Sequence, residues 1–414
     1  MLKYLISSVE QLLALMIMTG LLSAYLEHAF GPKGKLGTRI GICAGLIAGF
    51  VMGYFKNYTN RIDTGRWNLR NFSVMLAAFL VFLVMTALAK KVKWAGTAAV
   101  AAGAVMIALL FLYYLPDFLS YPHIVLQTEK TVFSTAFLYR MIGAVLGLVL
   151  CIVAGVSVFQ GALRLSLSVS FLLAVLALAV NEVKEITSSF SIMLAKRLIP
   201  SNHTLFVIAK HASNYSQWFI FLTIAVGAVV PVILWVRSFH VNEPYRNSAE
   251  RRKIIAKWRS ARRWSTSCLI CGVLSVLMLT SVKAYANREV ELSPIEDAPV
   301  KDGAVYVSFD QVSDGHLHRF GYTTEDGVTI RFIVIQKPNS SAYGVGLDAC
   351  DICGETGYYE KGGQVVCNLC DVVMNINTIG FKGGCNPKVI DYEIHDGNII
   401  VPVDGLMEYE SDFK

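Results

Sequence analysis

The sequence predicts a protein of two parts: a polytopic α-helical membrane domain of about eight spans and a small, mostly β, zinc-ribbon-like domain. Only 16% of the 414 residues are charged, whereas soluble proteins have about 25%, and the mean hydropathy is +0.51. Long apolar runs fill residues 1–285, and the residues after them have the composition of a soluble domain. We therefore expect a membrane domain over 1–285, a linker over 286–300 and a cysteine-rich domain over 301–414.

The eight predicted spans are apolar segments of suitable length. A membrane-spanning helix needs about 20 predominantly apolar residues. The segments that meet or approach this requirement are 5–27, 37–55, 72–90, 95–115, 137–157, 162–180, 217–237 and 266–285. The first contains Glu10 and has no small-residue cleavage site after it, so we do not interpret it as a signal peptide.

Lysine and arginine residues predict the orientation, because cytoplasmic loops of membrane proteins carry an excess of them. The most basic segment, 237–263, is expected in the cytoplasm. Alternation then places the loop of Lys33 and Lys35 inside, in agreement with its charge, and the basic loop 56–70 outside, against its charge. The N-terminus and the cysteine-rich domain are expected outside. This predicts a multi-pass protein of the bacterial inner membrane with a periplasmic or extracellular C-terminal domain.

Four ionisable residues lie beside the predicted spans. Glu182 and Glu185 follow the sixth span one helical turn apart, and His203 and His211 lie in the outer segment after it. Such groups are costly near lipid unless they pair, contact water or bind a cation. Two interpretations stay open: a hydrated interface with neighbouring lysines such as Lys184, or a cation path.

A C-x-x-C pair, Cys268 and Cys271, lies inside the last predicted span. In an apolar environment free cysteine behaves as a small hydrophobic residue. We therefore interpret this pair as helix packing, and Cys43 and Cys151 in the same way.

The C-terminal domain shows the pattern of short strands. One run covers 304–309, and apolar residues alternate from Val328 to Val334, as in a half-buried strand. Turn signals separate the runs at Asp302-Gly303, Asp326-Gly327, Gly362-Gly363 and Asp396-Gly397. A small domain built mostly from strands is the expected result.

The segment DACDICGETGYYEKGGQVVCNLCDVVMNINTIGFKGGCNP contains five cysteines, Cys350, Cys353, Cys367, Cys370 and Cys385. Two C-x-x-C pairs at this separation predict a tetrahedral four-sulfur metal site, with each pair in a tight turn. Gly354 suits such a turn because glycine tolerates positive φ. Gly362-Gly363 predicts a hairpin turn that brings the pairs together, as in a zinc ribbon.

Several alternatives stay open for this site. An outward-facing domain can form disulfides, although the cysteines are odd in number and C-x-x-C loops are short for bridges. Four thiolates suit zinc and iron equally. Cys385 lies in a glycine-rich loop and is a further candidate ligand, a resolving thiol or a buried residue. His316 and His318 would share one face of a strand and are accessory candidates, or else surface histidines.

Three stretches, DGHLHRFGY, DACDICGETGYY and VVCNLCDVVMNINTIGFKGGCNP, resemble the FtrD-like family of bacterial membrane iron–sulfur proteins over about residues 300–405. Members of that family are associated with iron-uptake systems. The resemblance implies an iron–sulfur centre whose ligands are Cys350, Cys353, Cys367, Cys370 and Cys385, with His316 and His318 as accessory ligands.

Two stretches of the membrane domain, LLALMIMTGLLSAYLEH with GICAGLIAGFVMGYF and VSVFQGALRLSLSVSFLLAVLALAVNEVKEI, resemble the oxidase-dependent iron permeases. The resemblance implies a permease-like scaffold. The Arg-Glu-x-x-Glu signature of that family is absent, and Ser8, Val9, Glu10 and Gln11 stand where its first copy is expected.

Together these features predict a membrane component of a bacterial iron-uptake system, with an outward-facing iron–sulfur cluster or mononuclear iron for electron transfer or iron handling. The expected partners are membrane lipids, a periplasmic iron-binding protein, a permease and a redox partner. The alternatives are a metal-delivery or transport subunit without redox chemistry, and a structural zinc-ribbon docking domain. No hydrolase or ATPase motif is present, so we expect neither of these activities. Whether the protein is an electron-transfer or redox component stays open. The basic residues cluster between spans, so we expect no nucleic-acid partner.

Overall fold

The computed structural model describes the chain except residues 60, 121–134, 197, 200–204, 206–208, 210–214, 240–242, 287–291, 339, 371 and 382–384, and except the side chains of 135, 136 and 195. The chain divides into two compact units, Met1–Ala286 and Asn287–Lys414.

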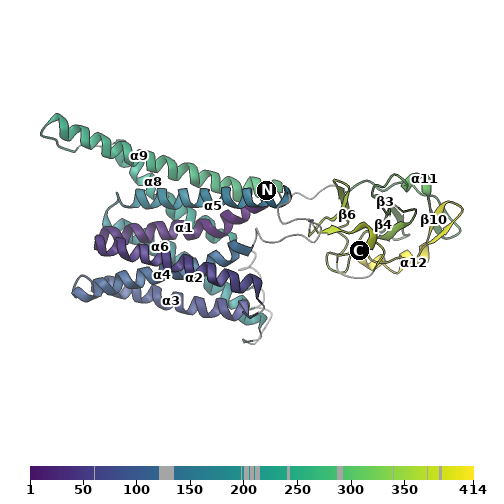
Figure 1. Ribbon diagram of the computed structural model, residues 1–414, viewed down its shortest axis with the longest axis horizontal. Coiled ribbons are helices and arrows are strands. Elements are labelled where there is room, and N and C mark those ends of the chain that lie inside the picture. Colours follow the sequence, from purple (N-terminus) through teal and green to yellow (C-terminus); the bar gives the residue numbers. More distant parts are fainter. Residues whose placement is uncertain are drawn as a thin grey trace. The chain divides into compact units, whose positions relative to one another are not determined.

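The first unit consists of long helices that run side by side (Figure 1). They are α1 (Leu2–Phe30), α2 (Pro32–Tyr58), α3 (Thr64–Leu88), α4 (Lys93–Ser120), α5 (Thr135–Ala162), α6 (Leu167–Ala195), α8 (Gln217–Phe239) and α9 (Ser248–Leu277). A π-helical turn, Met278–Val282, and the short α10 (Lys283–Ala286) extend α9. Within the described residues, eight helices are long and apolar enough to cross a membrane. The chain is therefore a multi-pass membrane protein, and the predicted helical domain is confirmed.

Helix α1 forms the centre of this unit, and most of its residues are buried. Leu12, Leu15 and Leu21 are fully buried although they lie on different faces of the helix. It contacts α2, α4, α5, α6 and α8. A helix that is apolar on every face is stable only when neighbours surround it or lipid covers it, and here other helices do so.

A stripe of glycines at every fourth residue of α2 allows close contact with α4: Gly37, Gly41, Gly45, Gly49 and Gly53. A Cβ atom at Gly45 would lie 2.8 Å from Cβ of Phe111 and 2.9 Å from Cα of Ala108. Small residues at this spacing let two helices in a membrane approach closely enough for backbone packing.

Helix α6 is longer than its predicted span, 162–180, because it begins at Leu167 and continues to Ala195. Glu182 and Glu185 therefore lie inside this helix and are buried, not beyond its end as the sequence suggested. A polar partner on α4, Tyr114, binds side chains of this extension. Lys184 donates a hydrogen bond to the hydroxyl of Tyr114 (3.0 Å), and this hydroxyl donates to Oδ1 of Asn181 (2.6 Å).

The second unit is mostly β, as predicted, and its described residues form three antiparallel sheets. The first has the order β1 (Val300–Lys301), β2 (Ala304–Ser308), β10 (Asn398–Pro402) and β9 (Glu393–His395). The second has the order β3 (His318–Thr323), β4 (Thr329–Gln336) and β5 (Tyr343–Leu347). The third has the order β6 (Tyr358–Lys361), β7 (Gln364–Cys367) and β8 (Val373–Met374). Short helices α11 (Phe309–Val312) and α12 (Val403–Met407) follow β2 and β10.

Strand β4 separates two small cores of this unit. Ile330, Phe332 and Val334 pack in one core. Ile333 and Ile335 pack on the other face with side chains of the cysteine region. The alternation correctly predicted a strand, but the strand is buried on both faces in its second half. The reason is that the cysteine region covers the face that would otherwise be open to solvent.

Candidate metal centre

The first C-x-x-C pair forms a tight turn between β5 and β6. The N–H of Cys350 donates to the carbonyl of Gly354 (3.1 Å), and the N–H of Gly354 donates to the carbonyl of Cys350 (3.0 Å). The N–H of Cys353 points at Sγ of Cys350 (3.1 Å). Gly354 has a φ of +66°, which explains why glycine closes this turn. An N–H group aimed at sulfur stabilises the thiolate form that a metal requires.

The second pair follows a two-residue hairpin, as the sequence predicted. Gly362 and Gly363 both have positive φ and connect β6 with β7, in a register that pairs Tyr358 with Cys367. The N–H of Cys367 donates to the carbonyl of Val372 (3.0 Å) and closes the second turn. Burial raises the pKa of Cys367, and the N–H groups of Leu369 and Cys370 act against this by hydrogen-bonding its sulfur.

All five cysteines of the domain meet at one place, although not as one compact four-sulfur group. Two triads are described whose sulfurs lie within 4.8 Å of one another: Cys350, Cys353 and Cys385, and Cys353, Cys367 and Cys370. The sulfurs of Cys370 and Cys385 are 3.7 Å apart. Tetrahedral ligands at a metal–sulfur distance of about 2.3 Å lie about 3.8 Å from each other, so these triads have a suitable size for metal ions.

Tyr358 links the loop of Cys385 to the two turns. This buried tyrosine donates from its hydroxyl to the carbonyl of Cys385 (2.7 Å). Burial raises the pKa of Tyr358, and the nearby sulfur of Cys350 raises it further. The phenol therefore keeps its proton and acts as a donor at neutral pH, which fixes the fifth cysteine beside the other four.

The thiols differ in their readiness to ionise. Burial, together with the neighbouring sulfur of Cys370, raises the pKa of Cys385 to about 11. Burial also acts on Cys370, but the N–H of Val372 and hydrogen bonds from neighbouring thiols outweigh it and lower the pKa. Cys370 is exposed, so the thiol with the lowered pKa lies at the surface of the group. Soft thiolate ligands of this kind suit zinc, iron and iron–sulfur clusters.

A buried ionic network supports the first turn from behind. Asp348 is fully buried and accepts from Nε of Arg319 (2.8 Å), from Nε of Arg331 (3.2 Å) and from the N–H of Tyr358 (2.9 Å). Arg319 also donates to the carbonyl of Ser293 (2.6 Å) and to that of Tyr358. Through Asp348, which lies two residues before Cys350, the network connects β3, β4 and β6. Sequence reasoning missed it, although charged residues among the apolar residues of β3 and beside β5 were a usable signal.

The two predicted accessory histidines are paired with carboxylates instead of cysteines. His316 contacts Glu360 through Nδ1 (2.9 Å), whereas His318 contacts Glu296 through Nδ1 (2.9 Å) and Asp314 through Nε2 (2.8 Å). Burial lowers the pKa of His318, but its carboxylate partners outweigh burial and raise it above the usual value. Only His318 is in strand β3. Among the described residues, the compact groups of metal-binding side chains contain cysteines alone.

The membrane candidates form a separate group. Within the described part of the chain, both oxygens of Glu182 and Oε1 of Glu185 are buried without a hydrogen-bond partner. Nζ of Lys184 lies 3.6 Å from Oε1 of Glu185. His203 and His211 lie outside the described residues.

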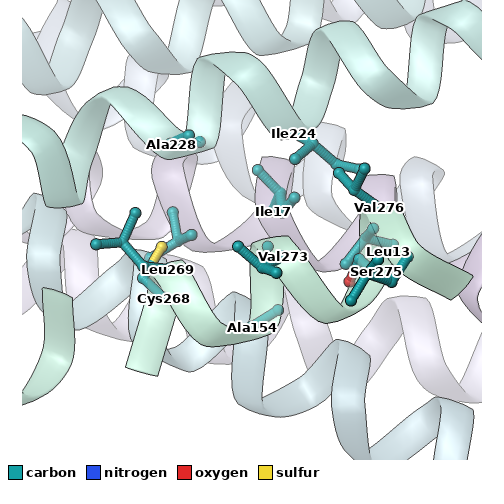
Figure 2. Close-up of a pocket in the computed structure, with 14 residues that line it drawn as sticks. Leu13, Ile17, Ala154, Ile224, Ala228, Cys268, Leu269, Val273, Ser275 and Val276 are labelled. Carbon is teal, nitrogen blue, oxygen red and sulfur yellow. The ribbon is translucent and has the colours of Figure 1, made fainter. Parts of the chain in front are cut away.

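The C-x-x-C pair of α9 is buried among helices. Figure 2 shows Cys268 at the wall of a cavity of about 330 Å³, which is also lined by apolar side chains such as Leu13, Ile17 and Ile224. Cys271 is also buried. Neither residue belongs to a compact group of metal ligands in the described residues, and the apolar surroundings agree with the packing interpretation.

The helices and the cysteine group define the class: a multi-pass membrane protein with a cysteine-rich domain that can hold metal. Residues 312–413 match the model of a family described as "Membrane iron-sulfur containing protein FtrD-like". The match lies within the C-terminal domain and includes all five cysteines of that domain, so the predicted family resemblance is confirmed for this region. Comparisons with curated proteins and with solved structures gave no match.

Proposed function

We propose that this protein is a membrane component of a bacterial iron-uptake system, in which the cysteine group holds an iron–sulfur cluster or mononuclear iron outside the cytoplasm. The convergence of five thiols from two turns and one loop carries the proposal. Iron bound by thiolates supplies one-electron redox chemistry. The protein itself holds the sulfurs in place through Tyr358 and the network around Asp348.

Exposed apolar side chains beside the sulfurs support a role in electron transfer to a partner. Ile352 and Leu369 occupy the middle of the two C-x-x-C turns and are 68% and 62% exposed. Because the two turns meet at their sulfurs, these side chains border one centre. Transient contacts between redox partners use small surfaces. The exposed apolar side chains around Cys370 provide a surface of this kind.

The first test is metal and sulfide analysis of the full chain, purified in detergent without oxygen. We expect iron, visible thiolate-to-iron absorption and a reversible reduction potential. Iron that is matched by acid-labile sulfide would identify a cluster, and iron without sulfide would identify a mononuclear or thiolate-bridged site. Zinc alone with no visible absorption would refute the redox role and would favour the docking domain.

A second test addresses the side of the membrane. The N-terminal half of α9 carries Arg251, Arg252, Lys253 and Lys257 and extends beyond its neighbours (Figure 1). The positive-inside rule supports a cytoplasmic position for this segment. A phosphatase fused after Lys414 should be active, because this enzyme folds only outside the cytoplasm. An inactive phosphatase together with a fluorescent cytoplasmic reporter would overturn the outward orientation.

The buried carboxylates of α6 favour one alternative, metal delivery or transport without a redox step. Both oxygens of Glu182 are buried without a hydrogen-bond partner in the described residues, and such a carboxylate in a membrane is costly and suggests a bound cation or a proton. The test is iron uptake into liposomes that contain the full chain or its Glu182→Gln/Glu185→Gln variant. Uptake that disappears in this variant, but persists in Glu27→Gln at the edge of α1, would support transport. Absence of uptake by the unmodified chain would exclude it.

A further inference from the structure

Cys353 has a central position among the five sulfurs of the domain. It is the member common to both described triads. The other members come from different segments: Cys350 and Cys385 belong to one triad, and Cys367 and Cys370 belong to the other. A single tetrahedral ion bound by the two C-x-x-C pairs would need all four sulfurs in one compact group. The described residues contain no such group of four.

We propose that the centre is dinuclear and that the thiolate of Cys353 bridges two metal ions. This rests on the proposed function only in that the cysteines hold metal. One ion binds Cys350, Cys353 and Cys385, and the other binds Cys353, Cys367 and Cys370. A thiolate sulfur has enough lone pairs to bind two ions. The sulfurs of Cys370 and Cys385, one from each triad, are 3.7 Å apart, so the two triads also meet at a second point.

This arrangement gives each ion three thiolate ligands, although thiolate-bound zinc and iron prefer four ligands. A fourth position is therefore available on each ion for water, for an incoming ligand or for a donor atom of a partner. An open coordination position distinguishes reactive sites from closed structural ones. The dinuclear arrangement also explains why the site has a fifth cysteine, which an ordinary zinc ribbon does not need.

The supporting contacts of Cys385 agree with a ligand role. Its carbonyl accepts from the hydroxyl of Tyr358, which packs with Cys350 and Cys367. The loop is thus attached to the same side chain that lines both cysteine turns. A cysteine that only filled space in the core would not need its sulfur at the edge of the group, where Cys385 is half-buried.

The experiment is an anaerobic titration of the reduced, metal-free full chain with Co²⁺. We expect two equivalents to bind with thiolate-to-cobalt absorption. Magnetic coupling through the bridging sulfur should make the EPR signal per ion weaker than in Cys385→Ser, which keeps one complete triad and should bind one equivalent. Cys350→Ser should also bind one equivalent. Cys353→Ser should show no magnetic coupling and should bind at most one equivalent of Co²⁺.

A matched control is the Cys268→Ser variant, which should bind two equivalents with the coupled signal. Circular dichroism of each variant without metal checks that the domain folds. One equivalent in the unmodified chain would overturn the dinuclear centre, and so would two equivalents that persist in Cys385→Ser. Four irons with matching sulfide in the isolated protein would also overturn it. Absence of any bound metal would refute the proposed function itself.

Discussion

The spacing C-x-x-C occurs in both parts of this protein, with different surroundings. In α9 the backbone between Cys268 and Cys271 is helical, and both thiols are buried among apolar helices. In the C-terminal domain the pair Cys350 and Cys353 forms a turn, and an N–H group points at a sulfur. Among the residues that the structure describes, the first pair has no third ligand in a compact group, and the second pair has other cysteines beside it.

The difference shows that spacing alone does not define a metal site. Two cysteines favour metal when the backbone turns both sulfurs toward one point, provides N–H groups that stabilise thiolates, and brings in further ligands. A helix in lipid uses its N–H groups for its own hydrogen bonds. The same two residue types then serve as small packing residues.

The largest expected effect is a loss of bound metal that differs between the C-x-x-C pair of α9 and the pairs of the C-terminal domain. The double variant Cys350→Ser/Cys367→Ser leaves each triad with two thiolates, so we expect more than 90% of the bound metal to be lost, about a tenfold change that corresponds to at least 1.4 kcal/mol. The measurement is metal content by mass spectrometry after purification. The matched control is Cys268→Ser/Cys271→Ser, which should keep its metal. Equal losses in both double variants would contradict the comparison.

The next effect concerns the scaffold of the cysteine turns. Asp348→Ala would leave the buried Arg319 without its carboxylate partner, and removal of one member of a buried ion pair costs about 3–5 kcal/mol. We expect the C-terminal domain to open more readily, as measured by hydrogen exchange of its β3–β4 peptide in the full chain. Asp326→Asn is the control, because its contact with Lys414 is at the surface and should matter by less than about 1 kcal/mol. Equal hydrogen exchange in both variants would show that the network around Asp348 does not stabilise the C-terminal domain.

The agreement between the sequence predictions and the structure also differs between the two parts. Apolar length located the eight long helices found in the described residues, because the bilayer imposes this length, but it ended the sixth span before Glu182. Composition does not show that Tyr114 and Asn181 provide polar partners inside the bundle. In the C-terminal domain, turn residues predicted the hairpin at Gly362-Gly363 correctly. The meeting of Cys385 with both turns depends on long-range packing through Tyr358, which local spacing cannot reveal.

A smaller effect tests how the membrane part is held together. A methyl group at Gly45 would collide with backbone and Cβ atoms of α4. A methyl group at Gly272 of α9 would have no atom within 4 Å outside the neighbouring backbone of its own helix. Overpacking costs about 1–3 kcal/mol. We expect Gly45→Ala to lower the thermal stability of the protein in detergent, and Gly272→Ala to leave it unchanged or slightly raised. A fluorescence melting assay measures both, and equal melting temperatures would refute the close α2–α4 contact.

The smallest expected effect is a pH dependence confined to the C-terminal domain. The pKa of His318 is raised by Glu296 and Asp314, so the folded state binds its proton more tightly than the unfolded state does. The stabilisation is complete below the ordinary pKa of about 6.5 and is lost as pH rises through the higher pKa of the folded state. For a pair near the surface, about 1 kcal/mol or less is expected.

Hydrogen exchange of the β3–β4 peptide, corrected for the intrinsic effect of pH, measures this loss as the pH rises above the ordinary histidine pKa of about 6.5. His318→Gln should remove most of the dependence. His316→Gln should keep it, because the side chain of His316 is 66% exposed and solvent screens its contact with Glu360. A dependence that is unchanged in His318→Gln would show that the two carboxylates do not hold a charged imidazole.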